Sequence, residues 1–155
     1  MKIVVLKFGG TSVGSIDKIK KVSNIINNHR KKNYKVIVVS SAMSGVTNEL
    51  IKKSQEISEN FSDEEYDVLV SSGEQIACSL IAGCLVHKGL KARSWLAWQI
   101  PIFTKGPHKN SRIIKIYKNE ILKYLKEGGI PIITGFQGIN NSERVTTIGR
   151  GGSDA

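Results

Sequence analysis

Lys7 ends an apolar run and is followed by two adjacent glycines and two hydroxyl residues, in the segment KFGGTS. Glycine N–H groups can approach an anion without a Cβ in the way, and a lysine adds positive charge. After a strand, such a cluster indicates a phosphate site, because ligand crevices in open α/β sheets face the carboxyl ends of strands. An ordinary turn is the alternative interpretation. The usual P-loop is excluded, because the pattern G-x-x-x-x-G-K-[ST] is absent and the lysine precedes the glycines.

Three more clusters of glycine and hydroxyl residues stand at strand ends or helix starts of the expected fold. They are SSAMSGVTN at 40–48, SSGEQ at 71–75, and the segment that runs from GFQG at 135–138 to TTIGRGGSDA at 146–155. Each cluster alone could be a turn. Because the carboxyl ends of parallel strands meet at one edge of a sheet, the four clusters together predict a single ligand crevice that favours anions.

The elements that must position these clusters follow from hydrophobic periodicity. Strands are expected over 2–7, 34–40, 90–96 and 129–136, with Ile3 to Leu6 buried, and a short extended piece plus loop over 98–111. Helices are expected over 16–32, 45–59, 111–127 and 63–87, the last of which can break at 71–73. This alternation predicts an α/β fold with right-handed crossovers and a parallel sheet covered on both faces.

Composition limits the class of protein further. The 155 residues are 40% hydrophobic, which suits one globular domain. We find no run of about 18 apolar residues and no secretory h-region, so we expect a cytoplasmic protein without a membrane span.

Cys78 and Cys84 lie six positions apart on one predicted helix, which makes a bridge between them improbable. The three histidines are scattered and no C-x-x-C occurs, so no bound metal is expected.

The net charge of +10 makes nucleic acid the main rival partner. Most lysines, however, fall on predicted amphipathic helices, as in the segments 16–32 and 112–128, where Ile and Leu recur at helical spacing between the charges; this pattern is typical of a solvated helix face. Aromatic residues make up only 6% and form no stacking series beside basic ones. We therefore expect no nucleic-acid partner.

Four motifs resemble, in order and spacing, the signatures of the aspartate kinases in the amino acid kinase family: KFGGTSV at 7–13, SAMSGVTN at 41–48, SSGEQ at 71–75 and TTIGRGGSD at 146–154. WLAWQIPI and TGFQG match the same pattern. The resemblance implies an open αβα sandwich with a mainly parallel sheet. It also implies transfer of the γ-phosphoryl group of ATP, with Mg²⁺ carried by the nucleotide, to L-aspartate. The product, 4-phospho-L-aspartate, begins the route to lysine, threonine, methionine and diaminopimelate.

The resemblance also assigns roles to residues. Lys7 would reach the transferring phosphoryl group and Asp154 would hold the catalytic lysines in place. The segment facing the ATP phosphates would comprise Lys7, Phe8, Gly9, Gly10, Thr11 and Ser12. The residues around the aspartate would be Ser41, Thr47, Glu74, Phe136, Arg150 and Ser153. In physical terms, the Arg150 fork suits a substrate carboxylate and Glu74 can pair with the α-ammonium group.

Each of these roles has a structural alternative. Lys7 could be a strand-end lysine that points to solvent. Asp154 could cap a helix, and Glu74 could complement a helix dipole in a first turn. Arg150 could form a surface salt bridge.

The family continues beyond the GRGGSD motif, with a segment for adenine and ribose, a second phosphate-contacting lysine and, commonly, ACT regulatory modules. We therefore expect residues 1–155 to be the N-terminal part of an amino acid kinase domain, either as a piece or as a naturally shortened product. Such a chain is expected to be inactive alone and to form homo-oligomers. A non-catalytic remnant or interaction module is one alternative. Another amino acid kinase, such as a glutamate 5-kinase or acetylglutamate kinase, is a second, which KFGGTSVG together with GRGGSD argues against.

Overall fold

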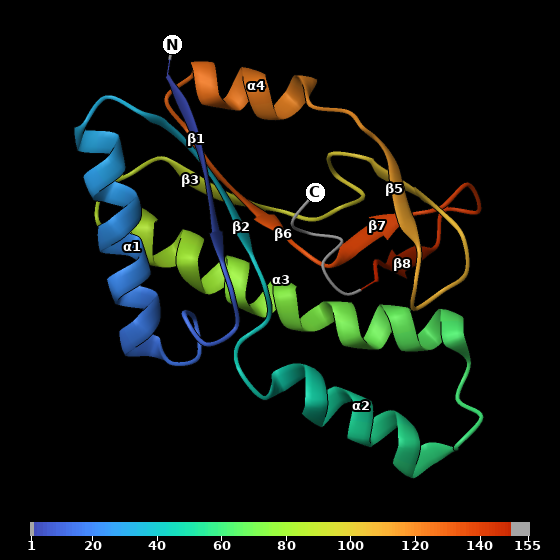
Figure 1. Ribbon diagram of the computed structural model, residues 1–155. Coiled ribbons are helices and arrows are strands. Elements are labelled where there is room, and N and C mark those ends of the chain that lie inside the picture. The colour runs from blue at the N-terminus through green and yellow to red at the C-terminus, as the bar shows by residue number, and fades with distance from the viewer. Residues whose placement is uncertain (1, 150–155) are drawn as a thin grey trace.

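The computed structural model describes residues 2–149 and has the α/β class that the sequence predicts (Figure 1). Along the chain the elements are β1 (Ile3–Phe8), α1 (Ile16–Lys31), β2 (Lys35–Ser40), α2 (Val46–Ile57), α3 (Asp63–His87), β3 (Ala92–Trp95), β4 (Ile102–Lys105), β5 (Arg112–Ile116), α4 (Asn119–Lys126), β6 (Ile130–Thr134), β7 (Gln137–Ile139) and β8 (Val145–Thr147).

The first sheet, sheet A, has the strand order β1-β2-β6-β3, and all its pairs are parallel. Its two faces are packed by different helices. Val36 and Val38 of β2 belong to the core formed with α1 and α3, whereas Ile37 packs against the core that includes Ile121 and Leu125 of α4. The predicted parallel sheet between helices is therefore confirmed.

The prediction that β1 is buried on both faces is wrong. Val4 and Leu6 pack against the core of α1 and α3, but Ile3 is 42% exposed and Val5 is 59% exposed. The reason is that β1 is an edge strand of sheet A, and the core on the α4 side takes residues from β2, β3 and β6 but none from β1.

A second sheet, sheet B, has the order β5-β4-β7-β8 with mixed pairing, and the sequence reading missed it as a sheet. The extended piece expected within 98–111 is strand β4. The prediction of a helix over 111–127 is wrong in its first part, because this segment forms strand β5 followed by the short helix α4. The run RIIKI in β5 is too short for its apolar spacing to separate strand from helix. Antiparallel pairing with β4 decides in favour of the strand.

Helix α3 is continuous, so the break expected at 71–73 is absent. Ser62 caps its N-terminus by accepting a hydrogen bond from the Glu65 N–H, and the hydroxyls of Ser71 and Ser72 bond to carbonyls three residues earlier within the helix. By length and composition, α3 alone among the described helices could cross a membrane, a feature that the sequence reading did not identify. Half of its most apolar stretch is buried within the protein, which is typical of a core helix.

Candidate active site

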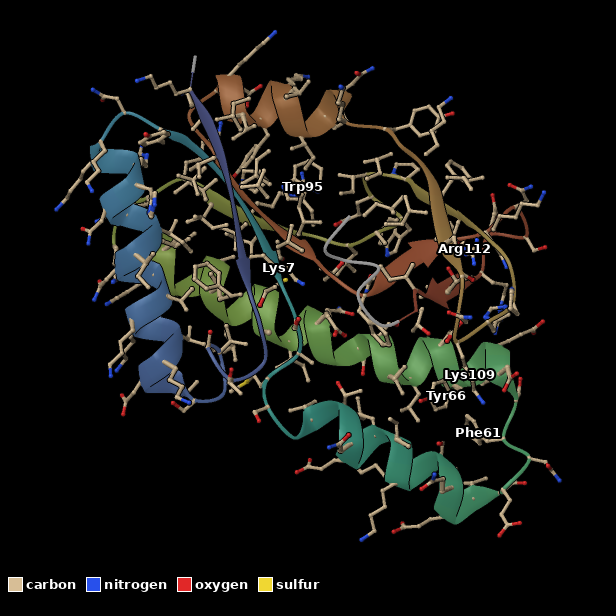
Figure 2. All side chains as sticks on the ribbon, viewed as in Figure 1. Lys7, Phe61, Tyr66, Trp95, Lys109 and Arg112 are labelled. Carbon is tan, nitrogen blue, oxygen red and sulfur yellow. The ribbon has the colours of Figure 1, made fainter. Side chains whose placement is uncertain are left out.

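A crevice of about 380 Å³ opens at the carboxyl end of sheet A, where the loops after β1 and β2 meet α2, α3 and the turn after β6. Lys7, labelled on β1 in Figure 2, lines it. The other lining residues are Gly10, Ser41, Ala42, Met43, Ser44, Gly45, Thr47, Asn48, Glu74, Phe136 and Gly149. The four sequence clusters therefore contribute residues to one crevice, as predicted, although SSGEQ lies within the continuous helix α3 and not at a strand end or a helix start.

Backbone hydrogen bonds join the loops after β1 and β2 into one layer. The Ser41 N–H donates to the Phe8 carbonyl at 3.0 Å, and the Ser44 N–H donates to the Gly10 carbonyl at 3.1 Å. A Cβ atom on Gly10 would lie 2.9 Å from the Ala42 carbonyl oxygen, so only glycine allows this approach. The KFGGTS loop and the SAMSGVTN loop are thus fixed relative to each other.

Glu74 is the buried titratable group of the crevice, with only 3% of its surface exposed. Its Oε1 accepts a hydrogen bond from the Ala42 N–H at 3.1 Å, whereas Oε2 has no partner among the described residues. Burial raises the pKa of Glu74 from 4.5 to about 7, and the Ala42 N–H opposes this rise only in part. A carboxylate in this state is suited to a cationic ligand group, which would satisfy Oε2 and stabilise the charged form.

Cys78 lies one helical turn beyond Glu74 and is also buried. Burial, with a further contribution from the Glu74 charge, raises the pKa of the Cys78 thiol to about 12. The thiol therefore stays neutral and is not a nucleophile at physiological pH. Both cysteines are free, as expected from their spacing.

The start of α2 forms one side of the crevice. Gly45 precedes the helix at φ +87°, no side chain caps this N-terminus in the described structure, and Thr47 and Asn48 of the first turn line the crevice. The partial positive charge of a helix N-terminus favours a carboxylate or phosphate there.

Phe136 sits in the turn after β6 with a left-handed backbone, at φ +63°. Its carbonyl accepts a hydrogen bond from the Ile148 N–H at 3.0 Å, which draws the end of β8 toward sheet A. In consequence Gly149, the first residue of the GRGGSD motif, reaches the crevice.

The crevice brings together six of the residues singled out from the sequence: Lys7, Gly10, Ser41, Thr47, Glu74 and Phe136. Phe8 is instead packed in the core, and Gly9, Thr11 and Ser12 belong to the adjoining turn without lining the crevice. Arg150, Ser153 and Asp154 lie outside the described residues, so their roles stay predictions.

The lining residues that sequence reasoning did not single out are Ala42, Met43, Ser44, Gly45, Asn48 and Gly149. All of them stand inside the quoted motifs, and Asn48 in particular has a polar side chain in a first helical turn. Among residues 2–149, no group of three or more His, Cys, Asp or Glu side chains could hold a metal ion.

Residues 2–155 match the sequence profile of the amino acid kinase family, and the chain therefore belongs to that family. Within it, the chain is 51% identical to the aspartokinase of Rickettsia conorii, over 99% of this chain and 39% of that protein. It is 46% identical to the aspartokinase of Geobacillus stearothermophilus, over 99% of this chain and 38% of that protein. The chain thus spans about two fifths of the length of these curated relatives.

Solved structures show the same fold. The aspartate kinase from Synechocystis superposes with a TM-score of 0.81 at 35% identity, covering 99% of this chain and 25% of that one. Escherichia coli aspartokinase III, crystallised with aspartate and ADP, superposes with a TM-score of 0.83 at 24% identity, covering 99% of this chain and 45% of that one.

Proposed function

We propose that this chain provides the amino-acid site and the first phosphate-facing loop of an aspartate kinase. The reaction is ATP plus L-aspartate giving 4-phospho-L-aspartate and ADP, with Mg²⁺ carried by the nucleotide. The observation that carries the proposal is the buried Glu74 carboxylate, whose unpartnered Oε2 shares a crevice with Lys7. The Glu74 carboxylate suits a substrate ammonium group, and the Lys7 ammonium group suits a phosphoryl group.

The geometry supports different roles for the groups that line the crevice. Glu74 binds the α-ammonium group, and the N-terminus of α2 with Thr47 orients a substrate carboxylate. A β-carboxylate oxygen then attacks the γ-phosphorus, the bond from that phosphorus to the bridging oxygen breaks, and ADP leaves. No proton transfer is needed, because the attacking carboxylate is already ionised at neutral pH.

Lys7 supplies positive charge beside the equatorial oxygens of the transferring group. Phosphoryl transfer depends mainly on positioning and on charge stabilisation, so a fixed ammonium group and the amides of the Gly9–Gly10 loop meet its requirements. Arg150 and Asp154 complete the proposed site as sequence predictions.

The proposal extends to the setting of the reaction. We propose that the product enters the biosynthesis of lysine, threonine, methionine and diaminopimelate, and that the protein acts in the cytoplasm, where ATP is available. We also propose a homo-oligomer, supported by the exposed apolar side chains of Ile3 and Val5 on edge strand β1.

The test uses a chimeric kinase in which residues 1–155 replace the corresponding segment of the Rickettsia conorii relative. Aspartyl phosphate is trapped as its hydroxamate, with L-glutamate as the competing acceptor. We expect preference for L-aspartate, because an extra methylene displaces a carboxylate that is held at both ends of the substrate. Equal efficiency with glutamate would contradict the substrate assignment, and absence of any turnover would favour a non-catalytic module.

A further inference from the structure

Asp67 lies on α3 seven residues before Glu74 and is completely buried. Three donors surround its carboxylate. The His108 Nδ1 donates to Oδ2 at 2.6 Å, the Thr147 hydroxyl donates to Oδ1 at 2.6 Å, and the Lys109 N–H lies 3.1 Å from both oxygens. A buried carboxylate requires such partners, and here every one of these donors comes from another part of the chain.

These donors belong to the two segments that hold Gly149 at the crevice. Thr147 is the last residue of β8, two positions before Gly149, and His108 and Lys109 lie in the loop between β4 and β5. Ser111, at the end of that loop, donates its N–H to the Thr147 carbonyl at 3.0 Å, and its own carbonyl accepts from the Gly149 N–H at 3.4 Å. Asp67 is thus linked to Gly149 both through the strand and through the loop.

The loop lies directly against Gly149. A Cβ atom on Gly149 would meet the Asn110 Oδ1 at 2.3 Å, so the Asn110 side chain of the loop lies directly against Gly149. Any movement of the loop away from α3 would therefore change the surroundings of Gly149.

Lys109 shows that α3 holds this loop firmly. Its backbone occupies the left-handed region at φ +66°, which is unfavourable for a side chain with a Cβ. Its ammonium group pairs with Asp63 and lies 4.5 Å from the centre of the Tyr66 ring, and Figure 2 shows Lys109 beside Tyr66 at the first turns of α3. Contacts with α3 offset the unfavourable backbone conformation.

We propose that Asp67 is a positioning residue that sets the end of β8 and Gly149 at a fixed distance from Glu74. Both carboxylates stand on one continuous helix, about 10 Å apart along its axis. Asp67 holds the sheet B side of the crevice, and Glu74 faces the ligand. This role rests on the proposed kinase function, since it concerns the geometry of the same site.

Amide hydrogen exchange on this chain tests the structural part of the proposal. Asp67→Ala removes all the bonds, and we expect the Ile148 and Gly149 amides to exchange about tenfold faster or more, as local opening becomes easier. Thr147→Val removes only the hydroxyl contact and replaces Asp67→Ala in this test if the alanine variant does not fold. Asp67→Asn should restore slow exchange, because its side-chain oxygen can still accept from the Thr147 hydroxyl and the Lys109 N–H.

The matched control is Thr104→Val. It deletes the 2.6 Å hydroxyl bond between Thr104 and Thr146, which is equally buried in sheet B but does not involve Asp67. If this control accelerates exchange at Gly149 as much as Asp67→Ala or Thr147→Val, the positioning role is wrong and Asp67 contributes only to general stability.

The functional part is tested in the chimeric kinase. We expect Asp67→Ala, or Thr147→Val in its place, to raise the KM for L-aspartate about tenfold, with a smaller change in the KM for ATP. Faster exchange without a change in the aspartate KM would overturn the role in substrate positioning. A wild-type chimera without activity would refute the proposed function, and the exchange experiment would still decide whether Asp67 holds Gly149.

Discussion

Replacing Glu74 by glutamine should change how the stability of this chain depends on pH. In the folded protein, burial raises the pKa of Glu74 from 4.5 to about 7, so folding favours the protonated carboxyl group. Between these two values the unfolded chain loses its proton while the folded chain keeps it. The free energy of unfolding therefore falls as pH rises through this window, and the loss is complete above the folded-state pKa.

The magnitude follows from the two pKa values. For one group that titrates at 4.5 unfolded and at about 7 folded, the wild-type protein should lose about 2.5 kcal/mol of stability between pH 5 and pH 8 relative to a variant without that group. Glutamine keeps the acceptor for the Ala42 N–H but cannot ionise. Its buried NH₂ group shifts the stability by a constant amount, which does not affect the difference between the two pH values.

Urea unfolding of the wild type and of Glu74→Gln at pH 5 and pH 8 measures this difference. The control is Glu49→Gln, which changes an exposed glutamate in the first turn of α2 and should follow the wild type. Parallel pH profiles for wild type and Glu74→Gln, within about 0.5 kcal/mol, the usual scatter of surface substitutions, would refute the inference that Glu74 is buried and protonated in the ligand-free protein.

Three further predictions follow from the proposed site. In the chimeric kinase, Lys7→Ala should lower kcat about a hundredfold or more with a smaller effect on the aspartate KM, as expected for loss of transition-state charge stabilisation. Steady-state kinetics measures this effect, with Lys2→Ala as the control, and an unchanged kcat would remove Lys7 from the mechanism. The 155-residue chain by itself should form no aspartyl hydroxamate, and turnover of about 1 per second, typical of kinases, would contradict this. The same chain should scatter light as a dimer or larger species, because Ile3 and Val5 are exposed, and a stable monomer would contradict that expectation. DNA or RNA binding should be weak and should vanish by about 0.2 M salt, because the lysines form solvated faces; a filter-binding titration tests this, and sequence-selective binding that survives such salt would restore the nucleic-acid interpretation.

The parallel sheet and the crevice were predictable because their signals are local. Buried strands such as β2 and β6 are short apolar runs, and the residues that follow them must meet at one edge of the sheet. The clusters that contain Lys7 and Thr47 follow such strands and could therefore be placed at one edge. Glu74 lies within helix α3, and its role, like those of the other two residues, came from the resemblance to the family motifs.

The parts that could not be predicted depend on contacts between distant residues. Ile3 and Val5 read as core residues, and only the packing of α4 shows that their side of β1 is uncovered. Asp67 reads as an ordinary polar residue near a helix start. Its partners His108 and Thr147 lie 41 and 80 positions away, in a sheet whose short strands had no clear periodicity.

The most direct test of the central claim, that L-aspartate binds with its α-ammonium group on Glu74, is calorimetric titration of the chimeric kinase at pH 7 in buffers of different ionisation enthalpy. With a pKa of about 7, Glu74 is about half protonated before binding, and the substrate ammonium forces it to ionise. The account predicts release of about half a proton per L-aspartate bound at pH 7, declining toward zero by about pH 9, as the titration of a single group requires. Binding without proton release at pH 7, or with proton uptake, would contradict it.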